Sequence, residues 1–182
     1  MKSSLRALLS YALFFCLCYF IFYITDPSAA QTLIWPDRFP AYADLTLMPG
    51  ADILDILQNQ TNPNLVFNNL AGNIILFGPV GFLMPLCWPY WRKLHRTVAF
   101  GAGLSLVIEL CQLCNVRATV TDDLLLNTLG TVLGYLCFAL LARLSGRMKA
   151  DVPGKWPPLR TAAAALLLYN LIDLAQYAHY VL

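Results

Sequence analysis

Five long apolar stretches constrain the fold of this chain more than any other feature of the sequence. A helix needs about 20 residues to cross a hydrocarbon core of about 30 Å, and each stretch is close to that length. Lipid offers no partner for free backbone N–H and C=O groups, so spanning segments must be helices, and the alternating pattern of a membrane barrel is absent. The sequence therefore predicts an all-α polytopic transmembrane bundle of about five spans, forming one membrane domain over residues 1–182. The stretches are 5–24, 66–86, 97–115, 124–144 and 161–182.

The composition excludes two other classes of protein. Hydrophobic residues make up 59% of the chain and charged residues 12%. So much apolar surface with so little charge would collapse, which excludes a disordered chain, and a soluble globule of this size could not hide it. The net charge of +2 is too small to indicate a nucleic-acid-binding surface. The apolar composition makes membrane lipids the expected partners.

Basic residues predict the orientation. If all five stretches span, ten of the twelve Lys and Arg residues fall on one side, and only Arg38 and Arg117 fall on the other. Positive charge stays on the cytoplasmic side of a membrane, so the N-terminus is predicted to be inside and the C-terminus outside. The ten are Lys2, Arg6, Arg92, Lys93, Arg96, Arg143, Arg147, Lys149, Lys155 and Arg160.

The first stretch has two interpretations. Small residues at Ser28, Ala29 and Ala30 fit the cleavage site of a secretory signal peptide. The apolar stretch, however, is longer than the usual signal core of about 7–15 residues, which favours an uncleaved membrane anchor.

The segment 25–65 is the one long connection, and it is predicted to lie outside. Within it, Ile53, Leu54, Ile56 and Leu57 alternate with Asp52 and Asp55. This spacing fits a short amphipathic helix on the membrane surface, and it equally fits a turn of the loop with chance spacing.

Polar side chains inside the stretches are the most informative residues, because each is costly in hydrocarbon unless paired. Counted from the outer ends at 1.5 Å per residue, Asn73, Glu109 and Asn127 lie about 8–10 Å deep and Asp173 about 13 Å deep. We therefore predict a polar cluster in the outer half of the bilayer, opening to the exterior. Its candidate ligand-binding residues are Asn69, Asn73, Glu109, Gln112, Arg117, Asp122, Asp123 and Asn127.

A purely structural role is the competing interpretation. Asn and Gln join helices by hydrogen bonds, and Gly130 and Gly134 have the spacing of a close-packing motif. Glu109 must be neutralised, and Arg117 is the nearest basic residue along the chain. Pro79, next to Gly78 and Gly81, cannot donate to the carbonyl of Ile75, so a kink or break is expected there.

The six cysteines all lie within or at the end of apolar stretches. Cys111 and Cys114 have the spacing of a metal or redox pair, but there is no second pair and no βαβ context. They are interpreted as small apolar side chains in lipid, and no metal site or cofactor is predicted.

Several of these residues belong to motifs that resemble the VanZ-like family of bacterial membrane proteins. The motifs are 69–85 (NLAGNIILFGPVGFLMP), 107–112 (VIELCQ) and 117–134 (RATVTDDLLLNTLGTVLG). The shorter stretch 45–49 (LTLMP) resembles an upstream motif, with Thr46 and Gly50 where the family has Asn and Phe. The positions carried over are Asn69, Asn73, Pro79, Gly81, Glu109, Gln112, Arg117, Asp122, Asp123, Asn127, Gly130 and Gly134.

The resemblance covers residues 45–135 and implies a bacterial cytoplasmic membrane, a link to the cell envelope and an association with teicoplanin resistance. It implies no reaction. Three functions remain open: a non-catalytic pocket that binds an envelope lipid or cell-wall precursor or limits access to it, an enzyme acting on an envelope lipid, and a small proton-coupled transporter. In the enzyme, Glu109 would be a general base and Asp122 with Asp123 would hold a metal. In the transporter, Glu109 and Asp173 would carry protons.

Overall fold

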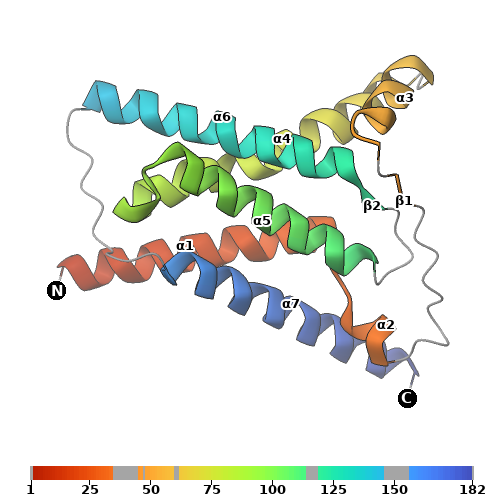
Figure 1. The fold of residues 1–182 in the computed structure, drawn as a ribbon. Coiled ribbons are helices and arrows are strands. Elements are labelled where there is room, and N and C mark those ends of the chain that lie inside the picture. The colour runs from red at the N-terminus through yellow and green to blue at the C-terminus, as the bar shows by residue number, and fades with distance from the viewer. Residues whose placement is uncertain are drawn as a thin grey trace.

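The computed structural model describes residues 2–34, 45–46, 48–59, 62–113, 119–145 and 156–181, and the predicted all-α membrane bundle is confirmed. Five long helices run along one common direction (Figure 1). They are α1 (Lys2–Thr25), α4 (Pro63–Cys87), α5 (Leu94–Leu113), α6 (Thr121–Ser145) and α7 (Trp156–Val181). The short elements are α2 (Ala30–Ile34), α3 (Ala51–Asn59), the 3-10 helix η1 (Pro89–Trp91) and the strands β1 (Leu45–Thr46) and β2 (Thr119–Val120).

Four of the described helices, α1, α4, α5 and α6, are long and apolar enough to cross a membrane. The fifth predicted stretch forms α7, which is 26 residues long but less apolar. Its second half carries Asn170, Asp173 and Gln176. The chain is thus a membrane protein with four clear candidate spans and a fifth helix of similar length.

Glycines bring α4 and α6 into backbone contact. A Cβ built on Gly130 would overlap the carbonyl of Ile74, and one built on Gly134 would overlap the carbonyl of Gly78. On α4, a Cβ on Gly81 would overlap the carbonyl of Thr131. In the pairs Gly130–Ile74 and Gly134–Gly78 the residue numbers differ by the same amount, 56, so the two helices run parallel. This is the close approach that small residues four apart permit.

The proline in α4 does not break the helix. α4 continues through both Pro79 and Pro85 to Cys87. Polar contacts gather where it ends, because Arg92 donates its Nε–H to the carbonyl of Pro85 at 3.3 Å and Tyr135 donates its hydroxyl to the carbonyl of Arg92 at 2.5 Å. The missing proline N–H groups are therefore accommodated within a continuous helix.

Large side chains fill the space between α1, α4 and α5. Phe14 of α1 packs edge-on against Trp88, with ring centroids 5.2 Å apart, and also contacts Phe100 of α5. Cys18 and Phe22 of α1 are fully buried in the same core. One face of α1 is therefore an integral part of the bundle.

The two short strands join segments that are far apart in sequence. β1 and β2 pair in parallel, with Leu45 opposite Thr119 and Thr46 opposite Val120. This places the segment that precedes α3 beside the start of α6 (Figure 1). Residues 51–59 are helical, so the helix is confirmed here and the alternative, a turn of the loop, is not.

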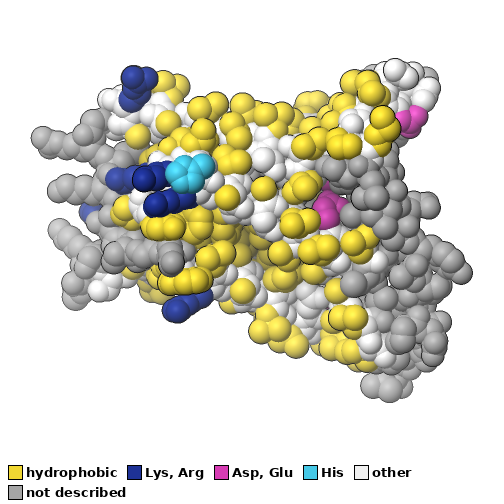
Figure 2. Space-filling model, viewed as in Figure 1, with side chains coloured by type: hydrophobic (Ala, Val, Ile, Leu, Met, Phe, Trp, Pro, Cys, Tyr) yellow, Lys and Arg dark blue, Asp and Glu magenta, His cyan; other side chains and the backbone are white. Residues whose placement is uncertain are grey.

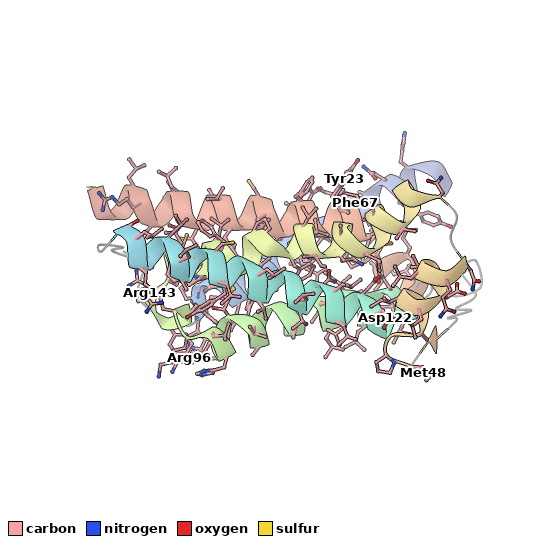
Figure 3. All side chains as sticks on the ribbon, turned by 90° about the horizontal axis from the view of Figure 1, so that it is seen from above. Tyr23, Met48, Phe67, Arg96, Asp122 and Arg143 are labelled. Atoms are coloured by element: carbon pink, nitrogen blue, oxygen red, sulfur yellow. The ribbon has the colours of Figure 1, made fainter. Side chains whose placement is uncertain are left out.

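Charge is divided between the two ends of the bundle. On the face shown in Figure 2, Lys and Arg lie at the end where α5 begins, and the visible Asp and Glu lie toward the opposite end. Figure 3 places Arg96 and Arg143 at one end and Asp122 at the other. We call these the basic end and the acidic end.

Candidate functional site

Polar side chains of three spanning helices meet near the acidic end. We call Asn73, Ser105, Glu109, Asp123 and Asn127 the central polar cluster. Asn73 of α4 donates its Nδ2–H to Oδ1 of Asp123 on α6 at 2.6 Å. An amide that meets a carboxylate makes a stronger bond than two neutral groups would, so this contact ties α4 to α6 just beyond their glycine crossing.

Asn127 links α6 to α5. Its Nδ2–H donates to the hydroxyl of Ser105 at 2.9 Å, and its side chain is only 2% exposed. Its Oδ1 is buried and has no hydrogen-bond partner among the residues that the structure describes. Asn127 lies six residues from the start of α6, which is about 9 Å along the helix. The cluster therefore contains a buried acceptor within a candidate membrane span.

Glu109 and Gln112 lie on the same buried face of α5. Glu109 is 6% exposed and Gln112 is 8% exposed. Gln112 donates its Nε2–H to the carbonyl of Thr25 at 2.5 Å, which satisfies one of the carbonyls left open at the end of α1. Gln112 thus joins α5 to α1, while Glu109 lies one turn deeper.

Asp122 holds the start of α3. Its two carboxylate oxygens accept the backbone N–H groups of Gly50, at 2.5 Å, and of Ile53, at 2.9 Å. In a capping box, the side chains of the N-cap and N3 residues of a helix bond to these same two groups. The N-cap position here is Gly50, with a φ of 85°, and it has no side chain to offer. A carboxylate from α6 therefore caps α3 in trans (Figure 3).

Some predicted site residues lie outside the described part of the chain. Arg117 and Cys114 fall in the range 114–118, and of Asn69 only the backbone, within α4, is described. The contact between Glu109 and Arg117 that the sequence suggests therefore remains a prediction.

A second polar group lies between the end of α1, α2 and α7, and it contains Asp173. We call Asp26, Gln31, Tyr169, Asn170 and Asp173 the α7 polar cluster. Tyr169 donates its hydroxyl to Oδ1 of Asp26 at 2.6 Å, and Gln31 donates its Nε2–H to Oδ2 of Asp173 at 2.7 Å. Oδ1 of Asn170 accepts the backbone N–H groups of Ala29 and Ala30. The described bonds of Asp173 therefore run to α2 and not to the central polar cluster.

The two clusters bear on the chemistry that the site can perform. Asp122 directs both oxygens at α3 and Asp123 bonds Asn73, so the adjacent carboxylates point at different partners. Glu109 and Asp173 belong to separate groups. The arrangement suits hydrogen bonding by amides and a hydroxyl better than a shared metal or a proton path between these carboxylates.

Two residues that position the cluster, Thr131 and Gly101, were not predicted from the sequence. Thr131 is fully buried, and its hydroxyl donates to the carbonyl of Asn127. A Cβ on Gly101 of α5 would overlap the Thr131 side chain, so Gly101 sets how closely α5 approaches α6. A glycine four residues before Ser105, on the same face of α5, is the sequence feature that would have indicated this contact.

A family model described as VanZ/LLP1 matches residues 10–142. The match extends at both ends beyond 45–135, the region in which the motifs were recognised, and stops before α7 begins. No curated protein and no solved structure matches the chain. The matched residues thus contain the whole central polar cluster, all of the candidate spans in α4 and α5, and most of those in α1 and α6.

Proposed function

Because the chain belongs to the VanZ/LLP1 family of membrane proteins, we propose that its central polar cluster binds the polar head of an envelope lipid or cell-wall precursor, or limits access to it. The cluster would face the outside of a bacterial cytoplasmic membrane. In this function the protein is non-catalytic, and it affects susceptibility to the glycopeptide teicoplanin through the ligand that it holds.

The charge division supports this orientation. On the face shown in Figure 2 the Lys and Arg side chains lie at the basic end, and positive charge is retained on the cytoplasmic side of membranes. In the proposed topology the basic end is cytoplasmic, the chain crosses the membrane several times, and the acidic end, with α3, lies outside. The basic residues concerned are Arg6, Arg92, Lys93, Arg96, Arg143 and Arg160.

The single observation that carries the proposal is the open acceptor of Asn127. A buried polar atom without a hydrogen bond costs about 1–3 kcal/mol, so an amide oxygen in this position is an unfavourable choice for structure alone. A donor from a ligand, such as a sugar hydroxyl or a peptide amide, would satisfy it. Both groups occur in the polar heads of cell-wall precursors.

The surrounding charges favour a ligand with two parts. Asp123 lies one turn before Asn127 on α6, and its carboxylate would repel an anion placed beside it. Arg117, on the predicted outer connection, is the residue proposed to meet an anionic phosphate. We therefore propose a ligand whose neutral donors enter the cluster while its phosphate stays at the outer surface.

Teicoplanin susceptibility tests this function. The host must be one in which the wild-type chain alters susceptibility, and the abundance of the protein in the membrane is measured in the same cells. Replacing Asn127 with Leu keeps the side chain branched at Cγ with the same number of heavy atoms and removes the amide. We expect N127L to lose most of the wild-type effect at normal abundance, because the amide oxygen that would accept from the ligand is gone.

Thr128→Val is the matched control. Thr128 is the next residue on α6, and its hydroxyl bonds only the carbonyl of Leu124 in its own helix among its described contacts. T128V should keep the wild-type susceptibility. If N127L also keeps it at normal abundance, the central polar cluster is structural and the proposal is wrong.

A further inference from the structure

Helices α5 and α7 form one face of the bundle, and this face reaches the basic end (Figure 1). We propose that the groove between these helices binds one acyl chain of an anionic phospholipid whose phosphate lies at Arg96. This site is separate from the central polar cluster and does not depend on its function.

The groove has a buried apolar floor and an open rim. It encloses about 420 Å³ between α1, α5 and α7. Phe22, Phe100 and Leu104 form buried parts of the floor, whereas Val107 and Leu159 on the rim are 40% and 41% exposed. The remaining lining residues are Gly103, Ala162, Ala163 and Leu166. Figure 1 shows α5 and α7 in front, with α1 between and behind them.

A hydrocarbon chain is the occupant that this lining fits. Every lining side chain is apolar, so nothing in the groove offers a hydrogen bond to a polar head or to water. The volume lies within the range of about 300–1,000 Å³ that small-molecule sites enclose. Because the rim is exposed on a helix face that contacts lipid, a chain can enter sideways from the bilayer.

A cation lies on the groove face at the basic end. Arg96 precedes Phe100, Gly103 and Val107 by four, seven and eleven residues, so all four share one face of α5. Its guanidinium lies 4.0 Å from the ring centroid of Tyr90 and donates one N–H to the carbonyl of Tyr90 at 3.0 Å.

Among the residues that the structure describes, four of its five N–H groups have no other hydrogen-bond partner and can meet a phosphate. Fixed by Tyr90, the guanidinium is held ready at the interface.

The length of the groove matches an amphiphile that stands along the bundle. From Arg96 to Val107 the distance is about 16 Å along the α5 axis, which is about half of a hydrocarbon core of about 30 Å. The cation lies at the interface and the apolar part reaches the middle of the membrane. Basic pockets between spanning helices on the cytoplasmic side are typical binding places for anionic lipids.

Native mass spectrometry of the full chain in mild detergent tests the site by counting bound lipid. The delipidated protein is titrated with dioleoyl phosphatidylglycerol or with dioleoyl phosphatidylcholine. We expect the wild type to retain one phosphatidylglycerol per chain and to prefer it over phosphatidylcholine by about fivefold, because one arginine near a charged surface contributes about that much.

Two variants separate the chain-binding and head-binding parts. Gly103→Phe places a ring in the groove, its Cβ meets no atom within 4 Å, and it should abolish retention of both lipids. Gly72→Phe on α4 is its matched control, since Gly72 is equally open and lies outside the groove. Arg96→Gln should remove the preference for phosphatidylglycerol, while Arg143→Gln at the same end should keep it.

Equal retention of the two lipids by the wild type would overturn the proposal, and so would retention of phosphatidylglycerol by Gly103→Phe. If circular dichroism shows that Gly103→Phe has lost its helices, Ala163→Phe on the exposed rim of α7 takes its place. The same retention by that variant contradicts the site. Teicoplanin susceptibility is not part of this test, so its outcome is independent of the central polar cluster.

Discussion

The α4–α6 pair and the α1–α7 pair are both parallel helix pairs, but they are joined in different ways. Between α4 and α6 the contacts are backbone to backbone, because Gly130 and Gly134 leave no side chain in the way. Between α1 and α7 the contacts are made by side chains, as between Tyr19 and Tyr169, whose ring centroids are 6.2 Å apart. An interface made of backbone has no side-chain volume to rearrange, whereas one made of side chains can repack.

The polar bonds of the two pairs differ as well. In the central polar cluster, Asn73 and Asp123 join two spanning helices to each other. In the α7 polar cluster, Asn170 and Asp173 fasten the segment that follows α1 to α7. The family match includes Asn73 and Asp123 and ends before α7 begins. The contrast indicates a closely packed unit around α4 and α6, with α7 attached to it through α1.

Gly134→Ala is the substitution with the largest expected effect on this contrast. The added methyl group would overlap the carbonyl of Gly78, and neither backbone can move without separating the helices. Overpacking a tight interface costs about 1–3 kcal/mol, occasionally more, and we expect the upper part of that range. Unfolding by sodium dodecyl sulfate in mixed micelles, followed by circular dichroism, measures it.

Gly72→Ala is the control for this prediction. Gly72 also lies on α4, and an added Cβ there meets no atom within 4 Å. Alanine favours a helix by about 1 kcal/mol over glycine, so G72A should be as stable as the wild type or more stable. If G134A and G72A unfold at the same detergent fraction, the α4–α6 contact tolerates an added methyl group, and the contrast with the α1–α7 contact is wrong.

A smaller loss is expected from Asn170→Ala in the other pair. The substitution removes the acceptor of the Ala29 and Ala30 N–H groups, at 3.2 Å and 3.4 Å. These contacts are partly exposed, so water replaces part of the loss and we expect about 1 kcal/mol. Hydrogen exchange at Ala29 and Ala30 should accelerate while exchange in α4 and α6 stays unchanged.

Asn170→Asp sharpens the same comparison. The carboxylate retains the oxygen that accepts from Ala29 but loses the donor to the carbonyl of Leu166. Exchange at Ala29 and Ala30 should then stay closer to the wild type than in N170A. Faster exchange in α6 from either variant would show that the two pairs are coupled, contrary to the division described above.

Length and hydropathy were sufficient to predict the helices. The stretches 5–24 and 66–86 form α1 and α4, with ends shifted by one to three residues. A helix is expected because a single apolar segment in lipid can satisfy its backbone hydrogen bonds in hardly any other way. The helical interpretation of 51–57, observed as α3, and the close approach at Gly130 and Gly134 were also accessible, since both depend on spacing within one segment.

Partners across segments were not accessible from the sequence. The periodicity of α7 places Asn170 and Asp173 on one face, but it does not say which helix that face meets, and a common depth with Glu109 suggested the wrong neighbours. Asp122 lies at the start of α6 and has the pattern of a cap for its own helix. The β1–β2 pairing, formed by two residues from each segment, holds the chain before α3 beside the start of α6, where Asp122 caps α3 instead.

The smallest predicted effect tests whether the central polar cluster contributes to stability at all. Ser105 and Asn127 form a single described bond, so Ser105→Ala, Asn127→Leu and the double variant make a double-mutant cycle. Such bonds between membrane helices average about 0.6 kcal/mol, because the separated helices also find partners. A cycle between Ser105→Ala and Thr128→Val should give no coupling, since the Thr128 hydroxyl bonds its own helix. A coupling well above 2 kcal/mol for Ser105 and Asn127 would mean that the polar bonds, and not the glycine contacts, hold this half of the bundle together.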